Sequence, residues 1–132
     1  MLNIWDRDIR VNDVVLGARA DSLPDPYRCV AVDWQDRSFE DWCHEADAID
    51  LTVIDGIVIR ISSSESFWVD GAGETIGATL SEVTEMIGET PEIEVVDGDQ
   101  LIAEFPRSRY SCFVLFGRVM SASIDDPDLI QD

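Results

Sequence analysis

Two segments of this chain pair apolar runs around a central turn. Residues 51–61 read Leu-Thr-Val-Ile-Asp-Gly-Ile-Val-Ile-Arg-Ile, and residues 112–122 read Cys-Phe-Val-Leu-Phe-Gly-Arg-Val-Met-Ser-Ala. β-Branched and aromatic residues favour strands, and a two-residue turn between antiparallel strands requires positive φ angles, which Asp-Gly adopts readily. The sequence therefore predicts two antiparallel hairpins, and the fold has to place both of them in a sheet.

The similarity between the two hairpins extends to segments that precede them. Leu-Gly-Ala at residues 16–18 has a counterpart in Ile-Gly-Ala at residues 76–78, at nearly the same offset as the hairpins. Self-similarity at a fixed offset is the signature of an internal repeat. We expect a single domain over residues 1–132, with repeat units at approximately 1–65 and 66–124 and an acidic tail at 125–132.

The second unit carries the clearer helix signal. Thr79 and Glu82 have the spacing of a capping box, Val83 belongs to an apolar helical face, and Gly88 is placed to end the helix. A strand is predicted at residues 100–105, before the hairpin. The predicted fold class is α+β: two tandem helix-plus-three-strand units form one curved antiparallel sheet with helices on one face.

The first unit departs from this pattern at two places. Pro24 and Pro26 allow a turn or two of helix at most, because proline lacks a backbone donor and restricts the preceding residue. A strand is predicted at residues 28–34, and an insertion without a counterpart follows at residues 35–50. Ser38 is placed to cap a short helix there, and an apolar stripe at helical spacing supports that prediction.

Charge limits the possible partners. Acidic residues outnumber basic ones by 28 to nine, every basic residue is arginine, and the formal net charge is −19. A chain with this charge repels nucleic acid and anionic membranes, and it attracts basic surfaces. Composition leaves a second explanation open, because salt-adapted cells use acidic surfaces for solubility.

The residues that usually carry catalysis or bind metals are sparse. His44 is the single histidine, and Cys29, Cys43 and Cys112 are too widely spaced for a zinc motif. Phosphate-binding loops and nucleophile motifs are absent from the sequence. We therefore predict a protein that is not an enzyme, with no catalytic residues, metal or cofactor. The three cysteines, together with the lack of a signal peptide or membrane span, predict reduced thiols in a cytoplasmic protein.

Part of the second unit resembles a known family. The residues concerned lie at 76–83, 87–91 and 117–119. They resemble the helix-and-sheet repeat of the SmpA/BamE type of outer-membrane assembly lipoprotein, and the tandem arrangement resembles the β-lactamase inhibitor protein. Bacterial toxin immunity proteins with this kind of repeat are also similar. The resemblance implies a protein-binding fold, and cytoplasmic immunity proteins need neither the lipidated cysteine nor the disulfides that this chain lacks.

These observations predict an immunity protein that neutralises a cognate toxin with a basic surface by occluding its active cleft. Carboxylates would stand in for the phosphates of a nucleic-acid substrate, and tryptophans would anchor the complex. The insertion is the predicted surface. Its candidate partner-binding residues are Trp34, Asp36, Glu40, Asp41, Trp42, Glu45 and Asp47.

Three alternatives remain open at this point. In one, Phe39 and Trp42 hold the insertion against the sheet while its acids face water. In another, the chain is an acidic scaffold or adaptor of a salt-adapted cell. In the third, it is a small ligand-binding protein, which would need a deep polar pocket. Unpaired sheet edges would permit a dimer as well as a monomer.

Overall fold

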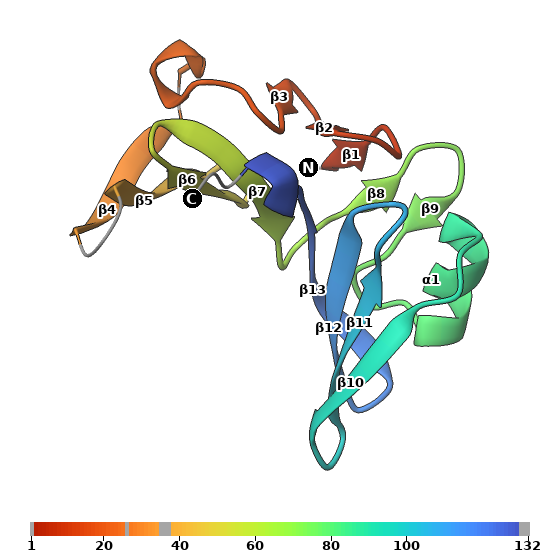
Figure 1. Ribbon diagram of the computed structural model, residues 1–132. Helices are drawn as coiled ribbons and strands as arrows, with labels where there is room; N and C mark the ends of the chain where they lie inside the picture. Colours follow the sequence, from red (N-terminus) through yellow and green to blue (C-terminus); the bar gives the residue numbers. More distant parts are fainter. Residues whose placement is uncertain (1, 26, 35–37, 130–132) are drawn as a thin grey trace.

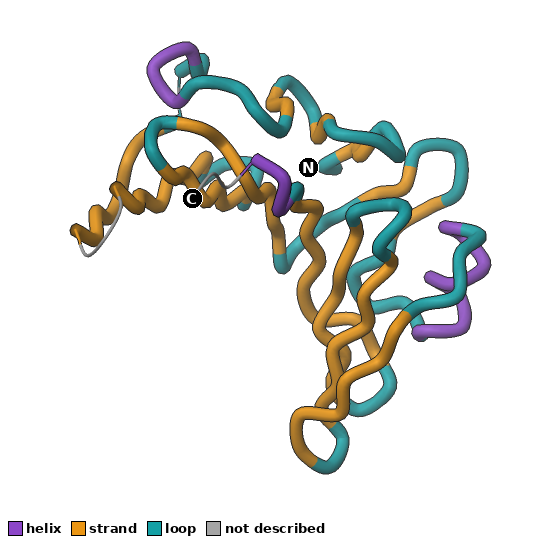
Figure 2. Tube along the Cα trace, viewed as in Figure 1, coloured by secondary structure: helices purple, strands orange, loops and turns teal. Residues whose placement is uncertain are grey.

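In the computed structural model, the chain folds mainly into β-strands. The structure describes residues 2–25, 27–34 and 38–129, with 51% of the chain in strands and 11% in helix. Figure 2 shows strands over most of the trace, with one α-helix and two short helical turns among the described residues. None of the described helices has the length and apolar character needed to cross a membrane.

The larger of the two sheets has eight antiparallel strands in the order β10-β11-β12-β13-β7-β6-β5-β4. Its strands are β4 (Arg28–Trp34), β5 (Ser38–His44), β6 (Ile49–Ile54), β7 (Ile57–Ser63), β10 (Glu92–Asp97), β11 (Gln100–Phe105), β12 (Tyr110–Leu115) and β13 (Arg118–Asp125). We call β4–β7 the first arm and β10–β13 the second arm. Each arm is a meander of consecutive strands, and this confirms the predicted antiparallel sheet.

The two arms are joined by β7 and β13, the last strand of each. These strands pair over four residues, from Ala122 opposite Ser63 to Asp125 opposite Arg60. Beyond this short contact the arms diverge, so the sheet is strongly bent where they meet (Figure 1). Twist accumulates from strand to strand, and irregular pairing in β6–β7 and β12–β13 adds local twist.

The smaller sheet lies on the side of the bend away from the space between the arms (Figure 1). Its order is β3-β2-β1-β8-β9, and β1 and β8 pair in parallel. Its strands are β1 (Ile4–Trp5), β2 (Arg10–Val11), β3 (Val14–Val15), β8 (Trp68–Val69) and β9 (Gly73–Glu74). The β1–β8 pair therefore joins segments that precede the first and second arms.

Both predicted hairpin turns are confirmed. Asp55 and Gly56 have φ angles of 53° and 79°, and Phe116 and Gly117 have φ angles of 51° and 78°. Positive φ at both central residues matches the right-handed twist of the flanking strands. Aspartate tolerates this conformation better than phenylalanine does, so the second turn carries more backbone strain than the first.

The predicted fold class is wrong. It required two helix-plus-three-strand units, whereas the structure has two sheets and one described α-helix, α1 (Leu80–Ile87). Among the described residues of the first half, the 3-10 turn η1 (Ala20–Ser22) is the one helical element, and it ends before Pro24. The predicted helix of the insertion is instead strand β5. β10 was not predicted, and it makes the second arm four-stranded.

The predicted helix of the second half is confirmed in detail. Thr79 accepts a hydrogen bond from the backbone N–H of Glu82, and the Glu82 carboxylate accepts one from the backbone N–H of Thr79. The hydrogen bonds that the Thr79 backbone N–H and hydroxyl donate to the Glu82 carboxylate hold the pKa of this carboxyl below its ordinary value. Gly88 ends the helix with a φ angle of 79°. Val83 is fully buried and attaches the helix to the core.

An aromatic cluster forms the centre of the core. The Tyr110 ring lies 5.4 Å from Trp5, 5.7 Å from Phe67 and 5.6 Å from Phe105, measured between ring centroids. All four side chains are almost completely buried. Trp5 belongs to β1, Phe67 precedes β8, and Phe105 and Tyr110 belong to the second arm, so the cluster attaches the small sheet to the large one.

We predict that Trp5→Ala lowers the free energy of unfolding by about 3–5 kcal/mol, because it leaves a large cavity at the centre of this cluster. Trp68→Ala is the matched control, since the Trp68 side chain is only partly buried. Urea denaturation of both variants measures the difference. Equal losses in the two variants would contradict the proposed role of Trp5.

Candidate functional site

The residues predicted to bind a partner do not share one surface. Strand β5 and the turn that follows it replace the predicted helix, so alternate residues point to opposite faces of the sheet. Asp36 lies outside the described residues, as does the side chain of Trp34 in β4. The remaining predicted residues are divided among the core side, the outer face and the turn.

Glu40 and Trp42 lie on the core side of β5. They stand opposite the buried residues Val53 and Leu51, and the Trp42 indole packs against the core. The indole N–H donates a 2.9 Å hydrogen bond to the Glu40 carboxylate. Trp42 thus packs β5 onto the core, as one alternative expected, whereas Phe39, which that alternative also named, is 37% exposed.

The turn after β5 forms a polar cluster that attaches the chain's first segment. The His44 Nε2 atom lies 3.3 Å from an Asp47 carboxylate oxygen, and both side chains are largely buried. The Tyr27 ring packs edge-on against His44 at 5.0 Å. Burial raises the pKa of Tyr27, and Asp13 and Asp47 add to the effect. Because Asn3 Nδ2 donates a 2.7 Å hydrogen bond to the Asp47 carbonyl oxygen, we assign this cluster a structural role.

The two other acids of the predicted set face water. Glu45 forms an ion pair with Arg28 on the exposed side of the β4–β5 hairpin. Asp41 stands opposite Thr52 on the outer face of the sheet, which is the face that the small sheet leaves uncovered. Asp41 therefore points to the surface on which the candidate site lies.

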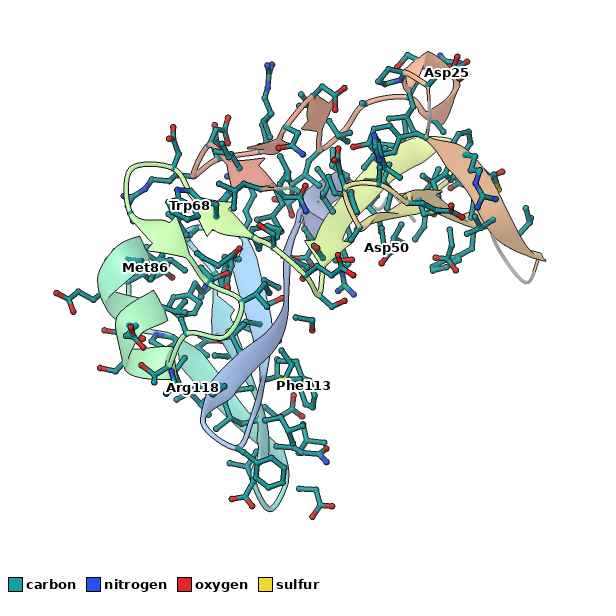
Figure 3. The ribbon with its side chains drawn as sticks, turned by 180° about the vertical axis from the view of Figure 1, so that it is seen from behind. Asp25, Asp50, Trp68, Met86, Phe113 and Arg118 are labelled. Carbon is teal, nitrogen blue, oxygen red and sulfur yellow. The ribbon has the colours of Figure 1, made fainter. Side chains whose placement is uncertain are left out.

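The candidate site is the trough between the two arms on this outer face. A row of directly paired residues crosses it, from Asp50 on β6 through Ser62, Ser123 and Ser111 to Glu104 on β11. Each arm thus contributes a carboxylate at one side, and three serines form the floor. Figure 3 shows Asp50 on one arm and Phe113 on the other, both beside the space between the arms.

The floor of the trough is hollowed. A depression of about 380 Å³ lies over the β7–β13 junction, and its lining includes the residues of the row together with Ile102 and Phe113. The Ser111 and Ser123 hydroxyls are 3.1 Å apart and bond to each other, and the Ser62 hydroxyl donates to the Asp50 carbonyl oxygen. Small hydroxyl side chains allow another backbone to approach closely, and the two apolar residues provide contact area on the second arm.

The electrostatic character of the trough is negative. Desolvation raises the pKa of the Asp50 carboxyl, and the nearby Asp41 charge adds to the effect. The basic group at the junction, Arg60, lies 3.2 Å from an Asp125 carboxylate oxygen, so its charge is already matched. Glu104 stands opposite Glu92 of β10. A cation placed in the trough would relieve these repulsions.

The chemical groups at the trough include carboxylates, hydroxyls and a buried thiol. Across the described ranges, no three His, Cys, Asp or Glu side chains meet in a metal-binding arrangement. Cys112 lies beneath the floor, and burial raises the pKa of its thiol to about 11, which suppresses the nucleophilic thiolate. The trough offers carboxylates, hydroxyls and apolar contacts, which are the groups that bind a basic protein segment.

Comparison of the chain with protein-family models, with curated proteins and with solved structures found no match. The resemblance to the helix-and-sheet repeat proteins stays a prediction. Function is therefore argued from the geometry and charge of the trough.

We predict that Asp50→Asn does not destabilise the protein at neutral pH and raises its melting temperature slightly. A carboxyl with a raised pKa in the folded state stabilises the fold when protonated, and that stabilisation is lost as the pH rises through the folded-state pKa. The advantage of the variant should therefore shrink at a pH below the ordinary value of 3.8. Melting curves at both pH values measure it, and a lower melting temperature at neutral pH would contradict the assignment.

Proposed function

We propose that this chain is a non-catalytic binding protein that receives a basic, protruding segment of a partner protein in the trough. The supporting observation is the row from Asp50 to Glu104, which places carboxylates on both arms above a floor of small hydroxyl residues. Charge excludes nucleic acid and anionic membranes as favourable partners, because the chain carries a net charge of −19.

The width of the trough favours a protein segment over a small molecule. Strands β6 and β11, which carry Asp50 and Glu104, are four strand spacings apart in the sheet. At about 4.8 Å per spacing, this separation is ~19 Å along the sheet surface. A helix with its side chains is about 10–12 Å across. A helix or hairpin with long basic side chains can therefore reach Asp50 and Glu104 together, whereas a small molecule seated in the depression would contact mainly the floor between them.

We propose toxin neutralisation as the biological form of this binding. The mode differs from the one expected from sequence, in which a protruding acidic helix would fill the toxin's cleft. Strand β5 takes the place of that helix in the described part of the insertion, so the chain would instead cover a protruding basic segment that the toxin needs for its action. Opposite charges on the two proteins would accelerate their encounter. The proposed location is the cytoplasm, where a buried thiol such as Cys112 stays reduced.

We predict that Asp50→Asn combined with Glu104→Gln weakens partner binding at least about tenfold, because a charge is removed from each arm. The matched control is Asp70→Asn with Glu85→Gln, which makes the same charge change at exposed positions outside the trough. The partner is first captured from the native host on the immobilised chain, and its affinity is then measured by calorimetry at low and high salt. Equal weakening by the two double variants would contradict the trough as the binding site.

Neutralisation is tested separately with the captured partner. We expect its expression to stop growth of a test strain and co-expression of the chain to restore growth. The trough variant should restore growth less well than the control variant. A partner that binds in the trough but does not affect growth would remove the toxin proposal and leave the binding proposal intact.

A further inference from the structure

Strand β10 (Glu92–Asp97) is an exposed edge of the large sheet. It pairs with β11 on one side, and no described strand pairs with its other side. All six of its residues are exposed. In Figure 1 the strand runs along the outside of the second arm. The edge therefore offers backbone donors and acceptors to an added strand.

The two faces of β10 differ in chemistry. Glu92 and Glu94 lie on the trough face, opposite Glu104 and Ile102 of β11. Ile93 and Val95 lie on the other face and are 53% and 68% exposed. These two large apolar side chains are exposed to solvent on a strand whose second edge is unpaired. An additional strand at that edge would cover part of their apolar surface.

We propose that β10 binds an extended segment of a partner protein by strand addition, and that this segment alternates basic and apolar residues. Main-chain hydrogen bonds would supply affinity and the alternating side chains would supply specificity. Basic residues on the trough face would stand beside Glu92 and Glu94, while apolar residues on the other face would cover Ile93 and Val95. This contact is separate from the trough floor.

A second copy of this chain is a poor occupant of the same edge. Two β10 strands pairing antiparallel would bring Glu92 and Glu94 of one copy against the same residues of the other. Like charges directly opposite each other destabilise strand pairing. Each copy also carries a net charge of −19, which opposes association. Charge complementarity therefore selects a cationic partner.

Strand addition is tested with a synthetic peptide of alternating arginine and valine, about as long as β10. Two further peptides carry N-methyl groups, one on every arginine amide and the other on every valine amide. Alternate amides of a strand point to opposite edges, so one methylated peptide loses its hydrogen bonds to β10 and the other keeps them. We expect the two affinities to differ at least about tenfold. Equal binding of both methylated peptides would show attraction by charge alone and overturn the proposal.

A pair of variants tests the location. Val95→Lys places a charge on the exposed apolar face of β10, and Val32→Lys makes the same change on β4, the opposite edge strand, where Val32 is 45% exposed. We expect the first variant to weaken peptide binding at least about fivefold and the second to change it less than about twofold. We also expect the backbone amides of β10 to exchange hydrogen with solvent more slowly when the peptide is added. Loss of binding in both variants, or unchanged exchange in β10, would place the peptide elsewhere.

Because Asp50→Asn with Glu104→Gln alters the trough and leaves β10 intact, that variant should retain the difference between the two methylated peptides. Failure of the trough proposal would leave this result unchanged. Failure of strand addition would likewise leave the trough variant's effect on the partner in place. The two proposals can therefore be rejected independently.

Discussion

The short pairing of β7 with β13 is the constraint on which the rest of the structure depends. Four residue pairs join two four-stranded arms into one sheet. Ile61 and Ile124 are paired there and fully buried, so the junction is fixed by apolar packing on its inner side. Its outer side carries Ser62 and Ser123, which need little volume. A sheet with large apolar residues on both faces at this point would have to be covered on both faces.

The same junction brings negative charge from both arms into one region of the surface. The bend turns the outer faces of the two arms toward each other, so carboxylates on separate arms act on the same space. Arg60 is paired with Asp125 at the junction and leaves little positive charge to offset them. Within the first arm, desolvation raises the pKa of the Asp50 carboxyl, and the Asp41 charge adds to the effect. The aromatic cluster around Tyr110 is buried on the opposite face of the sheet, where it stabilises the fold.

The sequence predicted those elements that depend on residues close together in the chain. The two hairpin turns and helix α1 follow from turn and capping residues a few positions apart. Strand β5 was mistaken for a helix because Phe39, Trp42 and Cys43 fit the spacing of a helical stripe. In the structure, side chains of β5 alternate between the two faces of the sheet, and Trp42 lies on the core side. β10 was missed because its alternation of acidic and β-branched residues has no buried face. Strands were expected within residues 4–15 and 66–75, but β1 and β8 are only two residues long, so their bounds could not be predicted from the sequence.

Most of the candidate site could not be predicted from the sequence. Ser62 and Ser123 are small polar residues of ordinary kind, and only the β7–β13 pairing places them side by side. Among the predicted partner-binding residues whose side chains are described, Asp41 alone lies on the outer face near the trough. The excess of acid was evident from composition, yet its organisation on two facing arms depends on contacts between distant segments. The adjacent serines at 62 and 63 in β7 and the alternating serines at 121 and 123 in β13 were the available signal.

The β1–β8 and β7–β13 pairings also determine how this chain must acquire its structure. Arg60 and Asp125 are 65 positions apart, and the buried hydrogen bond from Asn3 to Ser66 spans 63 positions. Forming such contacts costs the entropy of closing a long loop before the contacts can stabilise the fold. Proteins dominated by contacts of this kind therefore fold slowly. During synthesis, the first arm emerges with β7 lacking its neighbour and Trp5 lacking Tyr110. The amino-terminal half therefore remains an incomplete sheet during synthesis. We expect folding to finish only after β13, the last strand, has been synthesised.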